Sequence, residues 1–157
     1  MVIYVLIIIM KTVIFVCHGN ICRSVAAEYI MKQLLKDYGL DDRFIVYSRA
    51  TSLEEIGNDI YPPMKRALSN HDIEYGYHQA CQISKEDYEN ADYIFYMDSY
   101  NKRNLLFRFN DYKNIILPVT KYNPEYGCID DPWYSGQFDK VVEQLIECIK
   151  NIIQNIK

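Results

Sequence analysis

The stretch TVIFVCHGNICRS at residues 12–24 sets the start of the fold. TVIFV is short, β-branched and aromatic, which is typical of a strand buried on both faces. A small loop with Gly19 and Asn20 follows, and apolar residues then recur at helical spacing until Gly39 ends the pattern. The apolar positions are 26, 27, 30, 31, 34, 35 and 38. The segment predicts a strand, a loop and a helix in succession.

The same alternation recurs along the chain. Further strands are predicted at FIVYS (44–48), DYIFYM (92–97) and NIILP (114–118). Helices are predicted after the Pro62–Pro63 pair, after a capping box of Ser84 and Asp87, at Ser99 to Phe109, and over 138–156. Residues 119–136 lack periodicity and are expected to form a long loop.

This order of elements favours one α/β domain with three layers, α/β/α, around a four-stranded parallel sheet. Ligands of such sheets bind beyond the carboxyl ends of the strands. The loop after the first strand and the long loop after the fourth both emerge at that edge. We therefore expect the chemistry in residues 17–24 and 119–136.

Composition narrows the function further. The 157 residues suit a single domain, and 17 Lys and Arg against 21 Asp and Glu give a net charge of −4, which argues against nucleic acid or anionic membrane as partners. The five cysteines and three histidines lack disulfide-framework or zinc-site spacings, so we expect a cytoplasmic protein without a metal.

Residues 1–9 are apolar and need separate treatment. The first basic residue is Lys11, which follows the apolar run, so the segment does not fit a signal peptide. Even when extended to Val16 it falls short of the roughly 20 residues of a membrane span. We expect an N-terminal extension of residues 1–9 before a domain of residues 10–157, with Met10 as an alternative start.

The loop after the first strand places Cys17 six positions before Arg23. Backbone N–H groups between a strand end and a helix start can form a nest for a phosphoryl group, and the same field favours a thiolate nucleophile at Cys17. Arg23 supplies a planar fork of donors for phosphoryl oxygens, and Ser24 can donate to the sulfur. Gly19 and Asn20 tolerate the left-handed backbone that such a nest needs. The alternative is a buried cysteine, a surface arginine and a simple turn.

A thiolate that displaces an alcohol needs an acid for the leaving oxygen, and DDPWY at 130–134 provides one. Proline biases Asp131 toward an extended backbone, and Trp133 and Tyr134 can form an apolar wall. Asp130 is interpreted as a solvated neighbour. A solvated Asp-Pro turn is the alternative.

These pieces together resemble the low-molecular-weight protein tyrosine phosphatases, over Met10 to Lys157. The matching segments are VCHGNICRS (16–24), AAE (26–28), SRATS (48–52), EIGN (55–58), ISKEDY (83–88), YIFYMD (93–98) and DDPWY (130–134). The resemblance implies hydrolysis of phosphotyrosine in proteins or peptides, and of aryl or acyl phosphates, through a cysteinyl-phosphate. It also implies a monomer that needs no metal or other cofactor and is inhibited by phosphate or vanadate.

The resemblance also assigns roles to residues. Cys17 is the nucleophile, Arg23 the phosphate clamp, Ser24 the thiolate donor and Asp131 the general acid and then base. Phosphate is expected to bind the backbone of His18, Gly19, Asn20, Ile21, Cys22 and Arg23. Asn20, Ser48 and His78 are expected to hold the loop from behind, and Leu53, Glu54, Trp133 and Tyr134 to line the substrate groove.

Some positions depart from the family pattern. Val25 replaces a proline, Glu54 an aromatic residue and Cys81 an arginine, and Glu54 is expected to alter substrate preference. Ile21, where arginine phosphatases of this fold have threonine, favours phosphotyrosine. Cys22 is either a simple loop residue or a thiol that traps an oxidised Cys17.

Two other functions are alternatives. An arsenate reductase on this fold would need a relay of further thiols, and Cys81 lacks a cysteine partner shortly after it. A non-catalytic phosphotyrosine-binding or redox-sensing protein would need no acid at Asp131.

Overall fold

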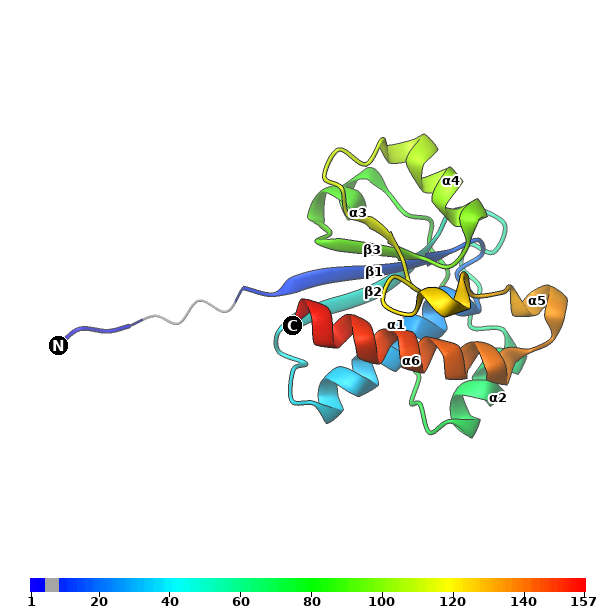
Figure 1. Ribbon diagram of the computed structural model, residues 1–157, viewed down its shortest axis with the longest axis horizontal. Helices are drawn as coiled ribbons and strands as arrows, with labels where there is room; N and C mark the ends of the chain where they lie inside the picture. Colours follow the sequence, from blue (N-terminus) through cyan, green and yellow to red (C-terminus); the bar gives the residue numbers. More distant parts are fainter. Residues whose placement is uncertain (5–8) are drawn as a thin grey trace.

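Four parallel strands form the centre of the fold, in the order β2-β1-β3-β4 (Figure 1). The computed structural model describes residues 1–4 and 9–157. The strands are β1 (Lys11–Cys17), β2 (Phe44–Ala50), β3 (Tyr93–Tyr96) and β4 (Ile116–Pro118). The predicted four-stranded parallel sheet is confirmed.

Strand β1 occupies the middle of the sheet because its side chains suit burial on both faces. The side chains of residues 13–16 are fully buried, as a run of β-branched and aromatic residues predicts. The strand pairs with β2 from Lys11 to Cys17 and with β3 from Val13 to Val16. Cys17 therefore emerges at the carboxyl edge of a central strand.

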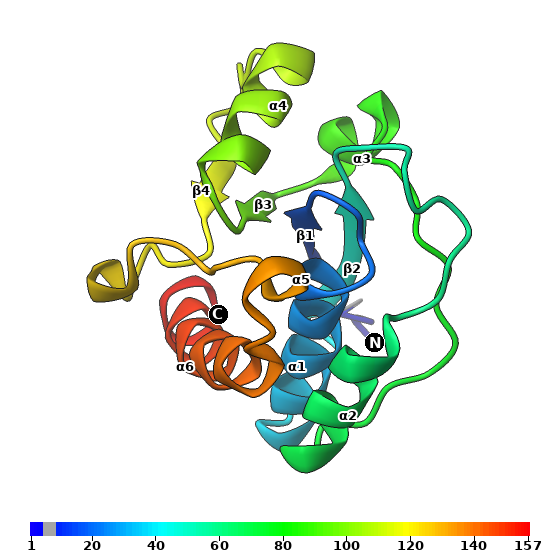
Figure 2. The same ribbon diagram turned by 90° about the vertical axis from the view of Figure 1, so that its right-hand side faces the viewer.

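Helices cover both faces of the sheet (Figure 2). On one side lie α1 (Arg23–Asp37), α2 (Pro62–Asn70) and α6 (Phe138–Ile156), and on the other α3 (Lys85–Asn90) and α4 (Ser99–Phe109). The buried apolar residues accordingly form two clusters, a large one under α1 and α6 and a smaller one under α3 and α4. The three-layer α/β/α architecture is confirmed.

The long C-terminal helix α6 follows its predicted apolar pattern closely. Its fully or nearly buried positions are Val141, Val142, Leu145, Cys148, Ile149, Ile152, Ile153 and Ile156. Burial of an aliphatic side chain of this size contributes about 1.5–3 kcal/mol, so this face is a principal source of the free energy that holds α6 on the sheet.

The structure corrects three details of the sequence prediction. Tyr38, assigned to the buried face of α1, is exposed because the helix already ends at Asp37. Strand β4 starts at Ile116 rather than at Asn114, whose backbone is left-handed. The segment 119–136 contains a 3-10 helix (Pro124–Tyr126) and the short helix α5 (Pro132–Ser135), which are too short to leave a periodic pattern.

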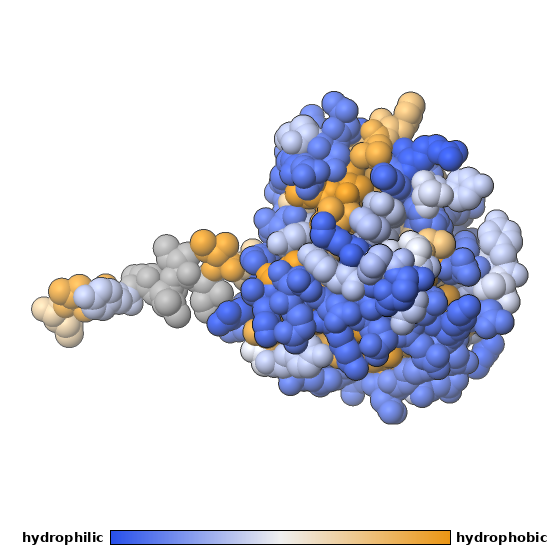
Figure 3. All heavy atoms as spheres, in the orientation of Figure 1, coloured by the Kyte–Doolittle hydropathy of each residue, from blue (hydrophilic) through white to orange (hydrophobic). Residues whose placement is uncertain are grey.

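Residues 1–4, 9 and 10 lie ahead of β1 and are not part of a helix or strand. Figure 3 shows apolar atoms among them, and the side chains of Met1 and Ile9 are exposed. Lys11, the first residue of β1, donates from its Nζ to the carbonyl oxygen of Ile156 at 2.6 Å. The boundary between residues 9 and 10 stays a prediction. Within residues 1–4 and 9–157, the structure has no helix of the length and apolarity needed to cross a membrane.

His71 links α2 to α6 and gives this contact a pH dependence. Its Nδ1 donates to the carbonyl oxygen of Ala67 at 2.8 Å, and its Nε2 lies 3.3 Å from Glu143 Oε1. The bond to Ala67 raises the pKa of His71, burial opposes the rise, and Glu143 and Asp139 support it. The stabilisation is therefore complete below the ordinary histidine pKa and is lost as pH rises through the raised one.

We expect His71→Gln to lower the free energy of unfolding by up to about 1 kcal/mol at pH 5.5, where the histidine is charged, and by less at pH 8.5. Urea unfolding of the wild type and the variant at both pH values measures this difference. An equal loss at the two pH values would show that the charge of His71 does not matter.

Candidate active site

The Cys17 sulfur lies in a tight loop between β1 and α1. Its Sγ is 3.0 Å from Ser24 Oγ and accepts a hydrogen bond from the Asn20 backbone N–H at 3.3 Å. Asn20 adopts the left-handed conformation, with φ of 63°, as predicted, whereas Gly19 does not. The left-handed turn at Asn20 brings its N–H back toward the sulfur, which is the geometry of an anion nest.

Asn20 holds the loop from behind through its side chain. Its Nδ2 donates to Ser24 Oγ at 2.8 Å and to Ser48 Oγ at 2.9 Å. The backbone carbonyl oxygen of Asn20 accepts a hydrogen bond from His78 Nε2 at 2.6 Å. The structure thus brings together Asn20, Ser48 and His78. Because Ser24 Oγ already accepts from Asn20, its single hydrogen is free to point at Cys17 Sγ.

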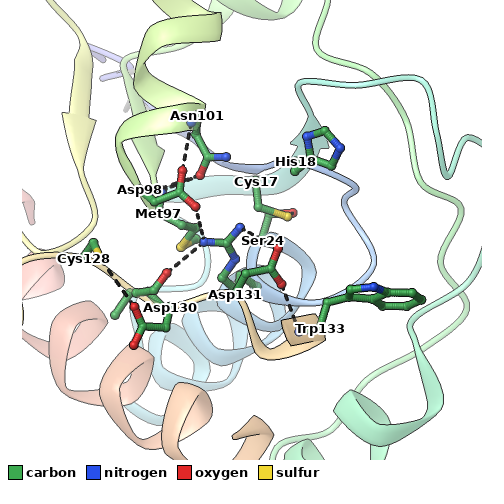
Figure 4. A network of polar contacts seen from close by, with 12 residues as sticks. Cys17, His18, Ser24, Met97, Asp98, Asn101, Cys128, Asp130, Asp131 and Trp133 are labelled. Atoms are coloured by element: carbon green, nitrogen blue, oxygen red, sulfur yellow. Dashed lines mark hydrogen bonds and ion pairs between the residues drawn. The ribbon is translucent and has the colours of Figure 1, made fainter. Parts of the chain in front are cut away.

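Arg23 is almost completely buried, with 2% of its surface exposed. Its Nη1 donates to Asp98 Oδ2 at 2.6 Å and to the carbonyl oxygen of Ile129 at 2.8 Å (Figure 4). Burial alone lowers the pKa of Arg23, but the charges of Cys17 and Asp98 more than offset this and raise it. Both Nη1 hydrogens are used, so Nη2 and Nε are the guanidinium donors left to face an oxyanion in the loop.

Asp131 reaches the same arginine from the second loop. It is the N-cap of α5, where its Oδ1 accepts from the Trp133 backbone N–H at 3.0 Å. Its Oδ2 lies 3.4 Å from Arg23 Nη2. The extended backbone predicted before Pro132 is present, with φ of −77° and ψ of 112°. Asp131, which follows Cys17 by 114 positions in the sequence, therefore lies at the same edge of the sheet.

Comparison with known proteins identifies the family. The model for "Low molecular weight phosphotyrosine protein phosphatase" matches residues 12–157. The chain belongs to this family. It is 37% identical to the human protein of that name, with 92% of this chain and 94% of the relative covered. It is 33% identical to the low molecular weight protein-tyrosine-phosphatase PtpA of Staphylococcus aureus, with 94% of each chain covered.

Solved structures agree with this assignment. The low molecular weight protein tyrosine phosphatase SP-PTP from Streptococcus pyogenes superimposes with a TM-score of 0.85 at 32% identity, covering 94% of each chain. The fold is therefore that of a low-molecular-weight phosphotyrosine phosphatase.

The predicted groove residues of this phosphatase are only partly brought together. Tyr134 lines the cavity that opens at Arg23, as does His18. Leu53, Glu54 and Trp133 are exposed and lie outside the lining of that cavity. Glu54 Oε2 instead contacts His18 Nε2 at 2.9 Å. The assignment of Leu53, Glu54, Trp133 and Tyr134 to the substrate groove stays a prediction.

Three groups at the site of the phosphatase were missed in the sequence. Asp98 and the Ile129 carbonyl bind Arg23, and Glu28 Oε1 accepts from Ser48 Oγ at 2.7 Å. Asp98 follows β3 directly, at the same sheet edge as Cys17, and this position was a signal that could have identified it. Nothing in the sequence pattern singled out a backbone carbonyl.

The remaining thiols of the phosphatase have different surroundings. Cys22 is buried, and burial together with the nearby Cys17 raises its pKa far above the ordinary value, so it is a neutral thiol at pH 7. A role for Cys22 in trapping an oxidised Cys17 stays a prediction. Cys81 is exposed. In the described ranges, 1–4 and 9–157, His, Cys, Asp and Glu side chains form no group of three or more that could hold a metal ion.

Asp98→Asn tests how Arg23 is held. Asparagine is as good an N-cap as aspartate, so α4 should keep its start while Arg23 loses a charged partner. A hydrogen bond to a charged group contributes about 1.5–3 kcal/mol, so we expect vanadate affinity and kcat/KM for p-nitrophenyl phosphate to fall about tenfold or more. Inhibition and steady-state kinetics measure both.

Asp87→Asn is the matched control, because it also removes a carboxylate that binds an arginine. Asp87 Oδ2 accepts from Arg49 Nε at 3.0 Å, at a site outside the Cys17 loop. The control is expected to keep its vanadate affinity. Unchanged vanadate affinity in Asp98→Asn would contradict a positioning role for Asp98.

Proposed function

We propose that this chain hydrolyses phosphotyrosine in proteins and peptides through a covalent cysteinyl-phosphate. Cys17 acts as nucleophile, Arg23 as phosphate clamp, and Asp131 as general acid and then as base. The observation that carries the proposal is the position of Asp131, whose Oδ2 lies 3.4 Å from the guanidinium that borders the Cys17 loop. This contact supports a site in which nucleophile, clamp and acid act on one phosphoryl group.

In the first step, the Cys17 sulfur forms a bond to phosphorus as the bond from phosphorus to the tyrosine oxygen breaks. Asp131 gives its proton to that oxygen, so tyrosine leaves neutral. Arg23 and the backbone N–H groups from His18 to Arg23 bind the phosphoryl oxygens as their charge shifts. Before attack, Ser24 and the Asn20 N–H stabilise the thiolate.

In the second step, the Asp131 carboxylate takes a proton from water and the water oxygen bonds to phosphorus. The sulfur–phosphorus bond breaks, and the electron pair returns to Cys17 as a thiolate. The hydrogen bond from Ser24 makes that thiolate a better leaving group, because it stabilises the charge that appears on sulfur. Inorganic phosphate leaves and the site is restored.

This function is favoured over the alternatives because each leaves part of the geometry unused. Non-catalytic phosphotyrosine binding and thiol-relay reduction of arsenate both lack a role for an acid at Asp131. Phosphotyrosine as substrate is supported by the names of the relatives and by the apolar Ile21 in the loop. The five free cysteines support a reducing cytoplasm, and we expect a monomer inhibited by phosphate or vanadate.

Cys17→Ser is expected to lower kcat for phosphotyrosine at least about 1000-fold, because a serine hydroxyl is not ionised here, while phosphate binding through Arg23 persists. Steady-state assays and calorimetric titration with phosphate measure the two properties. The control Cys81→Ser changes an exposed thiol and should leave kcat unchanged. Substantial activity in Cys17→Ser would exclude Cys17 as nucleophile.

Asp131→Asn keeps the acceptor that caps α5 but removes the proton donor. We expect the rate of tyrosine release to fall about 100-fold or more, and the release of p-nitrophenol to fall less, because p-nitrophenolate needs no proton to leave. Rapid-mixing measurements of the first turnover compare the two leaving groups. Equal losses for both would rule out the acid role.

A further inference from the structure

A cavity of about 1140 Å³ opens beside Arg23 and extends well beyond the phosphate loop. Its walls come from the start of α4 and from the segment that follows β4, and it includes His18 and Asp131 at the loop. In Figure 4, Asp98 and Asn101 lie at the start of α4, Cys128 and Asp130 lie along the later segment, and Trp133 lies away from both. We call this cavity the α4 groove.

The α4 groove is larger than one phosphotyrosine side chain requires. Pockets of 300–1000 Å³ hold whole drug-sized ligands. Much of the wall is apolar or aromatic, formed by Tyr100 on α4, by Pro118 at the end of β4, and by Ile129 and Tyr134 near the acid. The groove therefore has room for residues that flank a phosphotyrosine.

The carboxylates nearest to Arg23 in the groove are already engaged. Asp98 binds Arg23 and the Asn101 backbone N–H, and Asp131 binds the Trp133 backbone N–H and faces Arg23. Asp130 is exposed and accepts only from Cys128 Sγ, at 3.7 Å. Asp130 is thus the one groove carboxylate, among the described residues, that makes no contact with a cation within 4 Å.

Two lysines of the α4 groove face solvent without a carboxylate partner. Lys102 comes from α4 and Lys121 from the segment after β4, so the two groove walls contribute one each. Both are exposed, and within residues 1–4 and 9–157 neither forms an ion pair. The ammonium group of Lys121 lies 6.0 Å from the centre of the Tyr122 ring. The lysines and Arg23 formally balance the three carboxylates of the groove, but two of these carboxylates face Arg23, so Lys102 and Lys121 are the groove cations left to pair with an incoming carboxylate.

We propose that the α4 groove binds the polypeptide next to the phosphotyrosine and that Lys102 and Lys121 select acidic side chains there. The inference rests on the proposed phosphotyrosine phosphatase function and adds a substrate class to it. Charge complementarity supports this inference, because an acidic residue beside the phosphotyrosine would give the two lysines a carboxylate partner.

The expected effect is modest because both lysines are exposed. Exposed ion pairs contribute little, and salt screens them, so discrimination should be several-fold at low ionic strength and weaker in high salt. Contacts to flanking residues that are equally strong in the enzyme–substrate complex and in the transition state change KM rather than kcat. For a small aryl phosphate that does not reach the groove, kcat/KM should not depend on the two lysines.

The test uses the full chain and alanine-based phosphotyrosine peptides. Each peptide carries one Asp, or one Lys instead, at one of three positions on either side of the phosphotyrosine. For the wild type we expect kcat/KM to be about fivefold higher for the Asp peptide than for the Lys peptide at one position or more, at low salt. The Lys102→Glu/Lys121→Glu variant is expected to reverse this order, and Lys102→Ala/Lys121→Ala to abolish it.

Lys36→Glu/Lys140→Glu is the matched control, because it changes the net charge by the same amount and both lysines are exposed outside the groove, on α1 and α6. It should keep the wild-type order, which shows that net charge alone does not set the preference. All variants should retain the wild-type kcat/KM for p-nitrophenyl phosphate.

Two outcomes overturn the inference and leave the proposed function intact. One is equal kcat/KM for all peptides in a wild type that hydrolyses p-nitrophenyl phosphate, and the other is an unchanged preference in the double glutamate variant. Failure of the wild type to hydrolyse both p-nitrophenyl phosphate and phosphotyrosine would instead overturn the proposed function.

Discussion

The buried guanidinium of Arg23 is the constraint on which the site depends. A charged group with 2% of its surface exposed needs partners, because an unpaired buried charge costs several kcal/mol. Arg23 finds them in segments far apart in sequence: Asp98 after β3, the Ile129 carbonyl in the later loop, and Asp131 at the start of α5. Pairing this one charge therefore holds together the elements that carry Arg23, Asp98 and Asp131.

The arginine is held from one side so that it can act on the other. Asp98 and Ile129 occupy Nη1, which leaves the other edge of the planar fork for phosphoryl oxygens. Asp98 also caps α4 through its other oxygen, which accepts from the Asn101 N–H at 2.9 Å. The single carboxylate of Asp98 thus both caps α4, which forms a wall of the α4 groove, and orients Arg23. Asn20 likewise has two roles, because its side-chain amide donates to the hydroxyl oxygens of both Ser24 and Ser48.

Local patterns in the sequence were sufficient for the elements and for the first loop. The run TVIFV, the left-handed Asn20 and the amphipathic α6 depend on near neighbours, and all three agree with the structure. The roles of Asp98 and of the Ile129 carbonyl depend on contacts across 75 and 106 residues, which no periodicity encodes. The exposed positions of Leu53 and Trp133 likewise depend on how two loops pack. A family resemblance transfers the identity of such residues more readily than their exact surroundings.

In the proposed mechanism one aspartate serves both as acid and as base, and the charges at the site are consistent with both roles. The protein carries a net charge of −4, and a phosphotyrosine dianion meets Cys17, Asp98 and Asp131 close together. Arg23 is already paired with Asp98, so the backbone N–H groups of the loop supply much of the remaining attraction. An ionised Asp131 beside Arg23 Nη2 would repel the incoming phosphoryl oxygens, whereas a protonated one would not. In the proposed mechanism, the proton that Asp131 gives to the leaving oxygen thus also lessens the repulsion of the substrate as it binds. Once tyrosine has left with that proton, the Asp131 carboxylate is in the state in which it can take a proton from the water that attacks the cysteinyl-phosphate.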